Sequence, residues 1–433
     1  MKNVLWRKGL AVIFIMIFFN LTFSAAIGKL TLYEYKLPPP ASVDMPVEET
    51  FFRRMSVREF TEEPVTNNEL STVLWAAYGC RDDGEQTVPV IDGMHAVEIY
   101  VLKKDGVYKY DPLNHSLLFY RNGDYRYIGQ YNAPIQLGIV WNRSRNTNGN
   151  YVAAEMGAIG QNIQFMANAL GLGTVVTADF PPNNTLYVVG LPPDEVPRII
   201  MPVGHPRAPY NFIYLPLWFS LLPRVRVSDV NLSTAIKEWE TSTVFHGDIS
   251  RWELSQLLWA SYGYSYLLDV SRPEKKYITR HRTVPSAHAY YPLRMYAVTK
   301  NGVYRYVPGL YRYYMWGLPI VTFLLKIRDG DHRGEVAQAS SQPSIASAPL
   351  IIISVLDTVK ARGMLGKWDD LSGEEFRWLW YYEAGASVYN ILLETVAWNL
   401  SADITLPMHS DAIRGVLRLN DECLPLLIVP VGK

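Results

Sequence analysis

The pattern of hydrophobic and polar positions repeats the same series of elements twice along the chain. Each series has an amphipathic helix, two strands of alternating apolar residues, a third strand after Ala-Pro, a long helix and a closing strand. The first series is predicted at Asn67–Tyr78, Ala96–Leu102, Gly106–Tyr110, Ile135–Trp141, Tyr151–Leu170 and Ile199–Val203. The second is predicted at Arg251–Tyr262, Leu293–Thr299, Gly302–Tyr306, Leu350–Leu356, Glu374–Leu400 and Leu426–Val431. This order predicts an α+β fold of two similar units, each with an antiparallel-rich sheet flanked by helices.

Residue identities between the two series indicate an internal duplication. Segments Glu69–Gly79 and Glu253–Gly263 share 8 of 11 residues, and segments Glu155–Gly204 and Glu383–Gly432 share 15 of 50 without a gap. The offset between them grows from 184 to 228, which places the added residues in loops. We therefore expect two copies, at residues 50–207 and 235–433. Because duplicated units commonly keep the contact of an ancestral symmetric dimer, we expect a monomer that folds as an intrachain pseudo-dimer.

The segment that joins the copies, residues 208–234, is too apolar for a free linker. Its run from Tyr210 to Pro223 consists mainly of aromatic and aliphatic residues. Flexible linkers have the opposite composition, rich in glycine, serine and charged residues. We expect this segment to pack across one or both copies.

Composition and charge narrow the class of protein. The chain has 433 residues, enough for more than one hydrophobic core, and its 49% apolar and 19% charged residues are typical of a globular protein. The 41 basic and 41 acidic residues balance, so the chain has no electrostatic signature of nucleic-acid binding. Its 2 cysteines cannot form a disulfide scaffold or a four-cysteine zinc site.

The first 27 residues have the pattern of a targeting segment. Lys2, Arg7 and Lys8 precede the uncharged and mostly apolar stretch Gly9–Ile27. This pattern fits a cleaved signal peptide or a membrane anchor, and a buried helix of the fold is a third alternative. Because the basic residues precede the apolar stretch, we expect the rest of the chain to be extracytoplasmic, either membrane-anchored or secreted.

Four motifs resemble the FMN-dependent nitroreductase superfamily. They are the basic segment Arg53–Phe60, the glycine-containing helix end Leu170–Thr174, the proline-rich segment Leu191–Pro197 that leads to Pro202–Gly204, and the segment Arg282–Leu293. The last of these is similar to the branch that contains the azoline-oxidising dehydrogenases. The resemblance implies an α+β fold that normally forms a tight homodimer, with FMN held at the interface by both subunits. It also implies hydride transfer between NAD(P)H, or a donor substrate, and a small-molecule acceptor.

The resemblance also implies which residues bind the cofactor. Two guanidiniums and a hydroxyl spaced as in Arg54, Ser56 and Arg58 can converge on one phosphate, although a solvated helix turn is the alternative. A basic pair with strand spacing is the second phosphate contact, and the strand after the helix end offers backbone N–H groups to flavin N5. The loop with Pro-Ser comes from the other subunit. The candidate residues are Arg54, Met55, Ser56, Arg58, Val176, Thr177, Ala178, Asp179, Arg224, Arg226, Pro285, Ser286 and Ala287.

Comparison of the copies predicts one composite site per chain. An offset of 184 places Glu238, Glu240 and Ser242 where the first copy has its phosphate motif, and Asn399 and Ser401 stand where it has Gly171 and Gly173. The Pro-Ser motif is kept in the second copy and replaced by Pro89-Val-Ile in the first. The first copy would therefore supply the phosphate and N5 contacts, and the second copy the Pro-Ser loop.

These observations leave two hypotheses for function. The first is an FMN-dependent oxidoreductase, with His288 beside the Pro-Ser loop as a candidate proton donor. A structural or exposed role for His288 is the alternative. The second hypothesis is a flavin-free or non-redox extracytoplasmic binding or scaffold protein on the same fused fold. The sequence indicates neither the substrate nor the electron donor.

Overall fold

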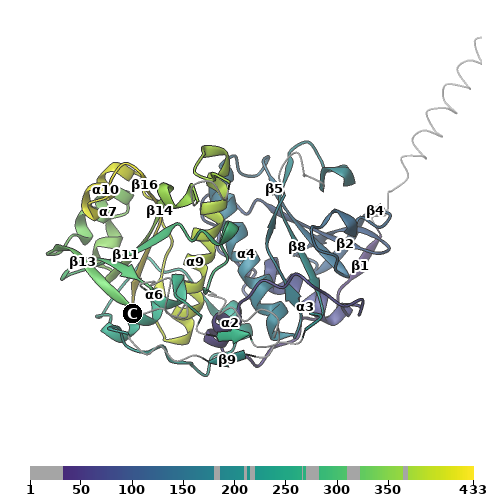
Figure 1. Cartoon of the computed structure of the whole chain (residues 1–433), viewed down its shortest axis with the longest axis horizontal. Helices are drawn as coiled ribbons and strands as arrows, with labels where there is room; N and C mark the ends of the chain where they lie inside the picture. The colour runs from purple at the N-terminus through teal and green to yellow at the C-terminus, as the bar shows by residue number, and fades with distance from the viewer. Residues whose placement is uncertain are drawn as a thin grey trace, which may run out of the picture.

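The computed structural model describes residues 33–179, 186–208, 212–214, 220–265, 267–269, 282–309, 322–363 and 369–433. The predicted targeting segment 1–27 and parts of the linker lie outside these residues. None of the helices in these ranges is both long and apolar enough to cross a membrane. Figure 1 shows two lobes that meet along a pair of long central helices.

The first lobe contains a mainly antiparallel sheet. Within the described residues the strand order is β1-β4-β3-β2-β5-β8-β6, and β7 also pairs with β8. Its strands are β1 (Glu34–Lys36), β2 (Val97–Lys103), β3 (Gly106–Asp111), β4 (Ser116–Asn122), β5 (Ile135–Asn142), β6 (Gly173–Thr174), β7 (Thr177–Ala178) and β8 (Glu195–Gly204). The central strands β2 and β5 are almost completely buried, which explains their continuous apolar character.

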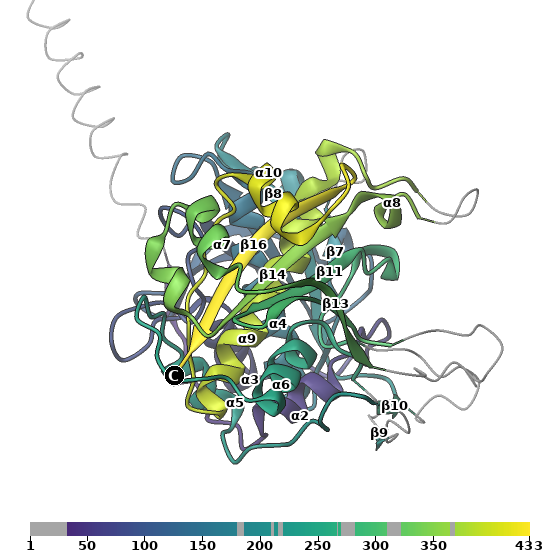
Figure 2. The same ribbon diagram turned by 90° about the vertical axis from the view of Figure 1, so that its left-hand side faces the viewer.

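The second lobe repeats this sheet. Its order, β13-β12-β11-β14-β16-β15, corresponds strand by strand to β4-β3-β2-β5-β8-β6. These strands are β11 (Leu293–Thr299), β12 (Gly302–Val307), β13 (Phe323–Asp329), β14 (Leu350–Asp357), β15 (Ser401–Ala402) and β16 (Cys423–Gly432). Helices α7 (Arg333–Ser340) and α10 (Ser410–Leu417) cover its outer face (Figure 2). The predicted α+β fold with two tandem units is confirmed.

Two 21-residue helices, α4 (Gly149–Ala169) and α9 (Arg377–Ala397), form the centre of the molecule. They lie side by side between the lobes in Figure 1. The helices are closest at Gly157 and Gly385, whose positions differ by the repeat offset of 228. A Cβ atom on Gly157 would be 2.6 Å from the Ala386 nitrogen, and one on Gly385 would be 2.6 Å from the Ala154 Cα. Only glycine fits at these two positions.

Equivalent hydrogen bonds recur at matching positions of the two copies. The Asn162 Nδ2 donates to the Ala76 carbonyl (2.6 Å), and the Asn390 Nδ2 donates to the Ala260 carbonyl (2.8 Å). The flanking helices α3 (Asn67–Tyr78) and α6 (Arg251–Tyr262) both begin with a capping box. Pro46, which precedes the first copy, forms a β-bridge with Asn231 in the linker that leads into the second. The copies therefore meet as an intrachain pseudo-dimer.

The short helices α2 (Val47–Arg53) and α5 (Leu232–Glu238) correct the predicted alignment of the phosphate motif. Arg54 is the C-cap of α2, and Trp239 is the C-cap of α5. The residues after these caps match at the same offset. The Val57 N–H donates to the Thr174 carbonyl, and the Ser242 N–H donates to the carbonyl of Ala402, the residue equivalent to Thr174, both at 2.9 Å. The local offset is thus 185, so the predicted match of Arg54, Ser56 and Arg58 to Glu238, Glu240 and Ser242 is wrong by one residue. The second copy has one residue fewer than the first between the short helix and the next one, which restores the offset of 184 at α6.

A second correction concerns the ends of the two long helices. Gly171 adopts a left-handed backbone conformation with φ 76°, and the equivalent Asn399 adopts the same conformation with φ 52°. Asparagine tolerates this region better than most residues. The second copy therefore keeps the geometry of the helix end without the glycine, so the missing glycine does not show a lost site.

The described part of the linker packs along the second copy and, near its end, against α2. Strand β9 (Phe212–Tyr214) pairs with β10 (Leu267–Asp269) in an antiparallel ladder. Leu222 is buried in the core, and the Trp252 indole donates to the Arg224 carbonyl (3.1 Å). The described linker residues thus contact the fold, while residues 209–211 and 215–219 of the apolar run lie outside the described residues.

Two buried carboxyl groups beside the linker give a testable pH dependence. Glu48 on α2 and Glu394 on α9 are both fully buried, and each has one carboxyl oxygen without a partner. Burial raises the pKa of both groups, and repulsion from Glu48 raises that of Glu394 further. A raised pKa stabilises the fold at low pH, and this contribution is lost as pH rises through the folded-state pKa.

We therefore expect Glu394→Gln to be more stable than the wild type at pH 8, by roughly 1–3 kcal/mol, the usual cost of a buried group without a partner. The difference should vanish well below pH 4.5, where the carboxyl is also protonated in the unfolded chain. Urea unfolding at the two pH values measures it. The exposed Glu375→Gln is the control, and an equal response of both variants would contradict the prediction.

Candidate functional site

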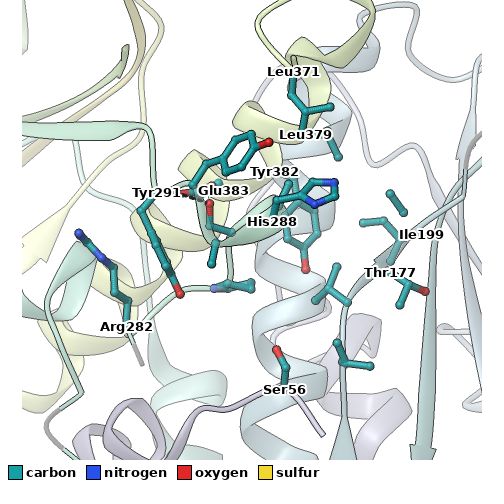
Figure 3. Close-up of a pocket in the computed structure, with 18 of the residues that line it drawn as sticks. Ser56, Thr177, Ile199, Arg282, His288, Tyr291, Leu371, Leu379, Tyr382 and Glu383 are labelled. Carbon is teal, nitrogen blue, oxygen red and sulfur yellow. Dashed lines mark hydrogen bonds between the residues drawn. The ribbon is translucent and has the colours of Figure 1, made fainter. Parts of the chain in front are cut away.

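A cavity of about 950 Å³ lies between the two copies. Arg54, Ser56, Arg58, the segment Val175–Ala178 and Ile199 line it from the first copy. The loop Pro285–Tyr291, which we call the Pro-Ser loop, lines it from the second copy, together with Trp378, Leu379, Tyr382 and Glu383 of α9. Figure 3 shows Thr177 and Ile199 on one side of the cavity and Arg282 and Tyr291 on the other. The structure thus brings together the two half-motifs that the sequence assigned to different copies.

The basic motif lies where α2 ends. Arg54 is only 3% exposed, its Nε donates to the Arg282 carbonyl (2.6 Å), and its Nη1 donates to the Gln164 Oε1 (3.0 Å). These bonds hold its guanidinium at the cavity wall and connect it to the second copy. Arg58 is exposed and curls back toward the Ser56 carbonyl (3.4 Å). The motif therefore offers one buried and one exposed cation beside a hydroxyl group.

Arg282 supports the Pro-Ser loop through its contact with the Tyr291 ring, a role that the sequence does not reveal. Its guanidinium lies 4.6, 4.6 and 4.7 Å from the ring centroids of Tyr262, Tyr264 and Tyr291. Its Nη1 also donates to the Tyr262 carbonyl (3.1 Å). Such cation–π contacts are strongest where the cation is desolvated, and Arg282 is buried. The one signal in the sequence is that Arg282 lies four residues before Ser286.

The Pro-Ser loop has an unusual backbone. His288, Ala289 and Tyr291 all have positive φ angles, of 49°, 56° and 48°, which residues with a side chain rarely adopt. The Ser286 hydroxyl accepts a hydrogen bond from the Tyr291 N–H (2.8 Å) and closes the loop. Clustered left-handed residues of this kind are typical of functional sites. His288 lines the cavity, with its Nε2 3.9 Å from an Asp369 carboxyl oxygen.

Four predicted cofactor residues do not line the cavity. Met55 packs against the small cluster around Val57 and Phe60. Asp179 is buried and accepts a hydrogen bond from the Leu186 N–H (3.4 Å). Arg226 lies over the Trp252 ring at 4.6 Å, and the structure does not bring Arg224 to the cavity either. Their spacing in the sequence could not indicate this, because the position of the linker depends on its packing against α6.

The lining combines positive charge with aromatic surface. Arg54, Arg58, Arg282 and Lys360 face a single lining carboxylate, Glu383. The aromatic lining residues are Tyr131, Tyr264, Tyr290, Tyr291, Trp378 and Tyr382. This combination suits a ligand with an anionic group and a planar ring system.

The position equivalent to the phosphate motif in the other half of the molecule holds different residues. Trp239 occupies the place of Arg54, and its indole donates to the Thr87 carbonyl (3.1 Å). The Arg81 guanidinium lies 4.5 Å from the Trp239 ring centroid and also donates to the Trp239 carbonyl. Both side chains are buried. Arg81 and Trp239 thus pack against each other at the position where the first half has its phosphate motif.

Comparison with known proteins agrees with this architecture. The model of the nitroreductase family matches residues 52–205. A protein of Methanocaldococcus jannaschii named "Putative nitroreductase" is 35% identical over 187 residues, which cover 38% of this chain and 93% of that protein.

Two solved structures are also similar. One, named as a "putative nitroreductase" from Anabaena variabilis, is 14% identical, has a TM-score of 0.63, and covers 92% of this chain and 94% of its own, so it supports the fold of both copies together. Another, from Ralstonia eutropha, is 30% identical with a TM-score of 0.38, and covers 41% of this chain and 91% of its own. The match over nearly the whole length of the Methanocaldococcus jannaschii protein shows that the chain belongs to the nitroreductase family.

Proposed function

We propose that the chain is an FMN-dependent oxidoreductase that transfers hydride from NAD(P)H or another donor to a small-molecule acceptor. One composite site per chain would carry out this transfer. The observation that carries the proposal is that the phosphate motif of one copy and the Pro-Ser loop of the other line the same cavity.

The donors of the cavity fit FMN. Ser56 and Arg58 offer a hydroxyl and an exposed guanidinium to a phosphate, and Arg54 places a third donor group beside them. Arginine is suited to phosphate because its planar donors match the oxygens in pairs. The aromatic walls suit a planar ring, and a volume of about 950 Å³ is in the upper range of cofactor sites.

Bound FMN would supply the hydride chemistry, and the residues of the chain would bind and orient it. Ser56, Arg58 and Arg54 would hold the phosphate end. The backbone of β7 would lie along the ring, as the family resemblance implies for Val176–Ala178. The Pro-Ser loop, braced by Arg282, would close the cavity from the second copy and exclude water from the ring.

The finer features are part of the same proposal. The similarity of the Pro-Ser loop to that of azoline-oxidising dehydrogenases suggests a place in that branch, without naming a substrate. The apolar N-terminal segment would keep the protein extracytoplasmic, attached to the membrane or secreted. The chain would act as a monomer, because the pseudo-dimer already supplies both sides of the site.

Flavin binding by the purified protein tests this function. We expect a yellow protein, and we expect Arg58→Ala and Arg54→Ala each to weaken FMN binding by roughly 1.5–3 kcal/mol, or about 10–150-fold. Flavin fluorescence quenching measures the affinity. Arg226→Ala distinguishes the two phosphate assignments, since the resemblance predicts a loss and the geometry predicts none. A folded protein that takes up no FMN would favour the non-redox binding or scaffold hypothesis.

A further inference from the structure

Lys360 is a cation at the wall of the cavity that forms no ion pair with any described residue. It lies on α8 (Thr358–Ala361), a short helix that follows β14 in the second copy. The Asp357 carboxyl caps this helix by accepting from the Lys360 N–H (3.3 Å), and it also pairs with the Arg294 guanidinium. The ammonium group of Lys360 is thus left without a carboxylate of its own.

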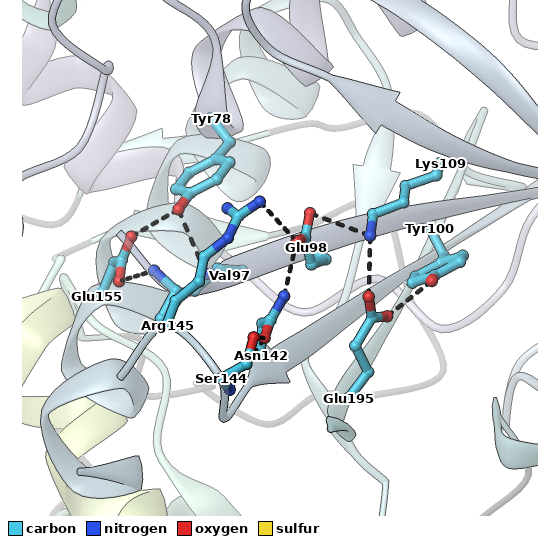
Figure 4. A network of polar contacts seen from close by, with 11 residues as sticks. Tyr78, Val97, Glu98, Tyr100, Lys109, Asn142, Ser144, Arg145, Glu155 and Glu195 are labelled. Atoms are coloured by element: carbon cyan, nitrogen blue, oxygen red, sulfur yellow. Dashed lines mark hydrogen bonds and ion pairs between the residues drawn. The ribbon is translucent and has the colours of Figure 1, made fainter. Parts of the chain in front are cut away.

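The first copy provides an internal comparison, because Arg145 is the equivalent residue at the offset of 215. Each of the two residues stands three positions after the end of equivalent strands, β5 and β14. The Arg145 guanidinium pairs with the Glu98 carboxyl (3.2 Å), and Figure 4 shows Lys109 and Asn142 on the same carboxyl group. Arg145 does not line the cavity. In the first copy this position therefore holds a neutralised cation.

A reversal of charge on the neighbouring strand explains the difference. Arg294 on β11 occupies the position that Glu98 occupies on β2, as the register with β14 and β5 shows. Instead of offering a carboxyl group to Lys360, Arg294 itself takes up the Asp357 carboxyl. The described part of the second copy therefore lacks the carboxylate that neutralises the equivalent cation in the first.

The surroundings of Lys360 are positively charged. Partial desolvation lowers the pKa of Lys360, the charges of Arg282, Arg294 and Arg305 lower it as well, and the charge of Asp357 raises it. Asp357 is already paired with Arg294, so its charge does not neutralise Lys360 fully. An anion beside the ammonium group would be stabilised by this excess of positive charge.

The charge balance of the whole cavity leads to the same conclusion. Arg54, Arg58, Arg282 and Lys360 line it together with one carboxyl group, Glu383, among the described residues. The excess is three positive charges when Glu383 is ionised, and the phosphate of FMN would bring about two negative charges at neutral pH. Because Arg54 and Arg58 belong to the phosphate motif and Arg282 is enclosed by tyrosine rings, Lys360 is the cation left for a second ligand.

We propose, on the basis of the proposed function, that Lys360 is an anion-binding subsite of the cavity, and that the acceptor substrate carries a carboxylate group that binds there. One carboxylate brings the single negative charge that balances the cavity. Lysine offers a compact charge with three rotatable donors, which suits a single carboxylate. FMN would use the phosphate motif of the first copy, and the acceptor would use Lys360 of the second.

Benzoate and benzamide are suitable probes, because they have the same planar shape and differ by one negative charge. We expect the FMN-loaded protein to bind benzoate about 10-fold more tightly than benzamide, the gain from one charge-assisted hydrogen bond. Lys360→Gln should remove this preference and Lys360→Arg should retain it, while both variants keep the FMN affinity of the wild type. The change in flavin absorption on ligand binding measures these affinities.

Arg145→Gln is the matched control at the equivalent position of the first copy and should leave the preference for benzoate unchanged. Equal affinity of the wild type for benzoate and benzamide, or an unchanged preference in Lys360→Gln, would overturn the subsite. Competition with NAD⁺ and NADP⁺ tests a phosphate as the ligand of Lys360, and we expect both to displace benzoate equally. Displacement by NADP⁺ alone would assign Lys360 to the phosphate of the donor and overturn the carboxylate.

Failure of the wild type to bind FMN would overturn the proposed function without deciding on the subsite. Calorimetric titration of the apo-protein with benzoate then tests Lys360 separately. We expect benzoate binding that is lost in Lys360→Gln and kept in Arg58→Ala, because Arg58 belongs to the phosphate motif. The opposite result would place the anion at the phosphate motif and overturn the proposal.

Discussion

Titration of the apo-protein with FMN is expected to saturate at one FMN per chain. The composite cavity offers Arg54, Ser56 and Arg58 to a phosphate, whereas the equivalent position holds Trp239. Loss of two charge-assisted contacts, each worth roughly 1.5–3 kcal/mol, weakens binding there by about 10²–10⁴-fold. The second position should therefore stay empty at micromolar FMN.

The reason for this asymmetry is the Arg81–Trp239 contact rather than repulsion by carboxylates. The guanidinium and the indole are packed together and buried, so a phosphate would have to displace them. Trp239→Ala is the control, because it makes space without adding a phosphate donor and should leave the stoichiometry at one. Equilibrium titration by calorimetry measures the number of sites, and two equivalent tight sites would contradict the prediction.

Gly385→Ala is expected to destabilise the protein by roughly 3 kcal/mol, at the upper end for overpacking. The added Cβ would approach the backbone of Ala154 on the facing helix, to 2.6 Å from its Cα and closer still to its carbonyl oxygen. Backbone atoms of a buried helix cannot move aside as a flexible side chain can. Relief would require the two central helices to separate, which would also strain the cavity between the copies.

Gly415→Ala provides the control for this prediction. Gly415 lies inside α10, and a Cβ there would meet no atom within 4 Å. Alanine favours the helix over glycine by about 0.5–1 kcal/mol, so this variant should be slightly more stable than the wild type. Urea unfolding measures both variants. Equal effects of the two substitutions would show that helix propensity, and not close packing at the pseudo-twofold axis, determines the result.

The sequence predicted the duplicated fold because periodicity and internal identity are local properties of the chain. The helices and strands of both copies, and the pairing of the phosphate motif with the Pro-Ser loop, were accessible in this way. The alignment of Arg54 with Glu238 was wrong, because the segment between α5 and α6 is one residue shorter than the segment between α2 and α3, and this difference leaves no mark in a low-identity segment. The hydrogen bonds around α2 and α5 reveal it.

Other features of the site depend on contacts that no sequence pattern encodes. Arg282 has its role only because three tyrosines surround it after folding. Glu155 contacts His95, which lies 60 residues away along the chain, whereas the residue at the equivalent position beside Glu383 is Tyr291. Arg226 has the spacing of a phosphate-binding pair but lies on Trp252, because the linker follows the second copy.

The covalent connection between the copies has a consequence for dilution and for mutation. A homodimer dissociates when its protomers become scarce, and each mutation in its gene alters both of its clefts. Here the two walls of the cavity belong to one chain, so their encounter is unimolecular and independent of concentration. Residue 81 of the first copy can also mutate independently of residue 265, its counterpart in the second copy. One cleft can therefore become filled by packed side chains, as with Arg81 and Trp239, while the other cleft keeps its phosphate donors.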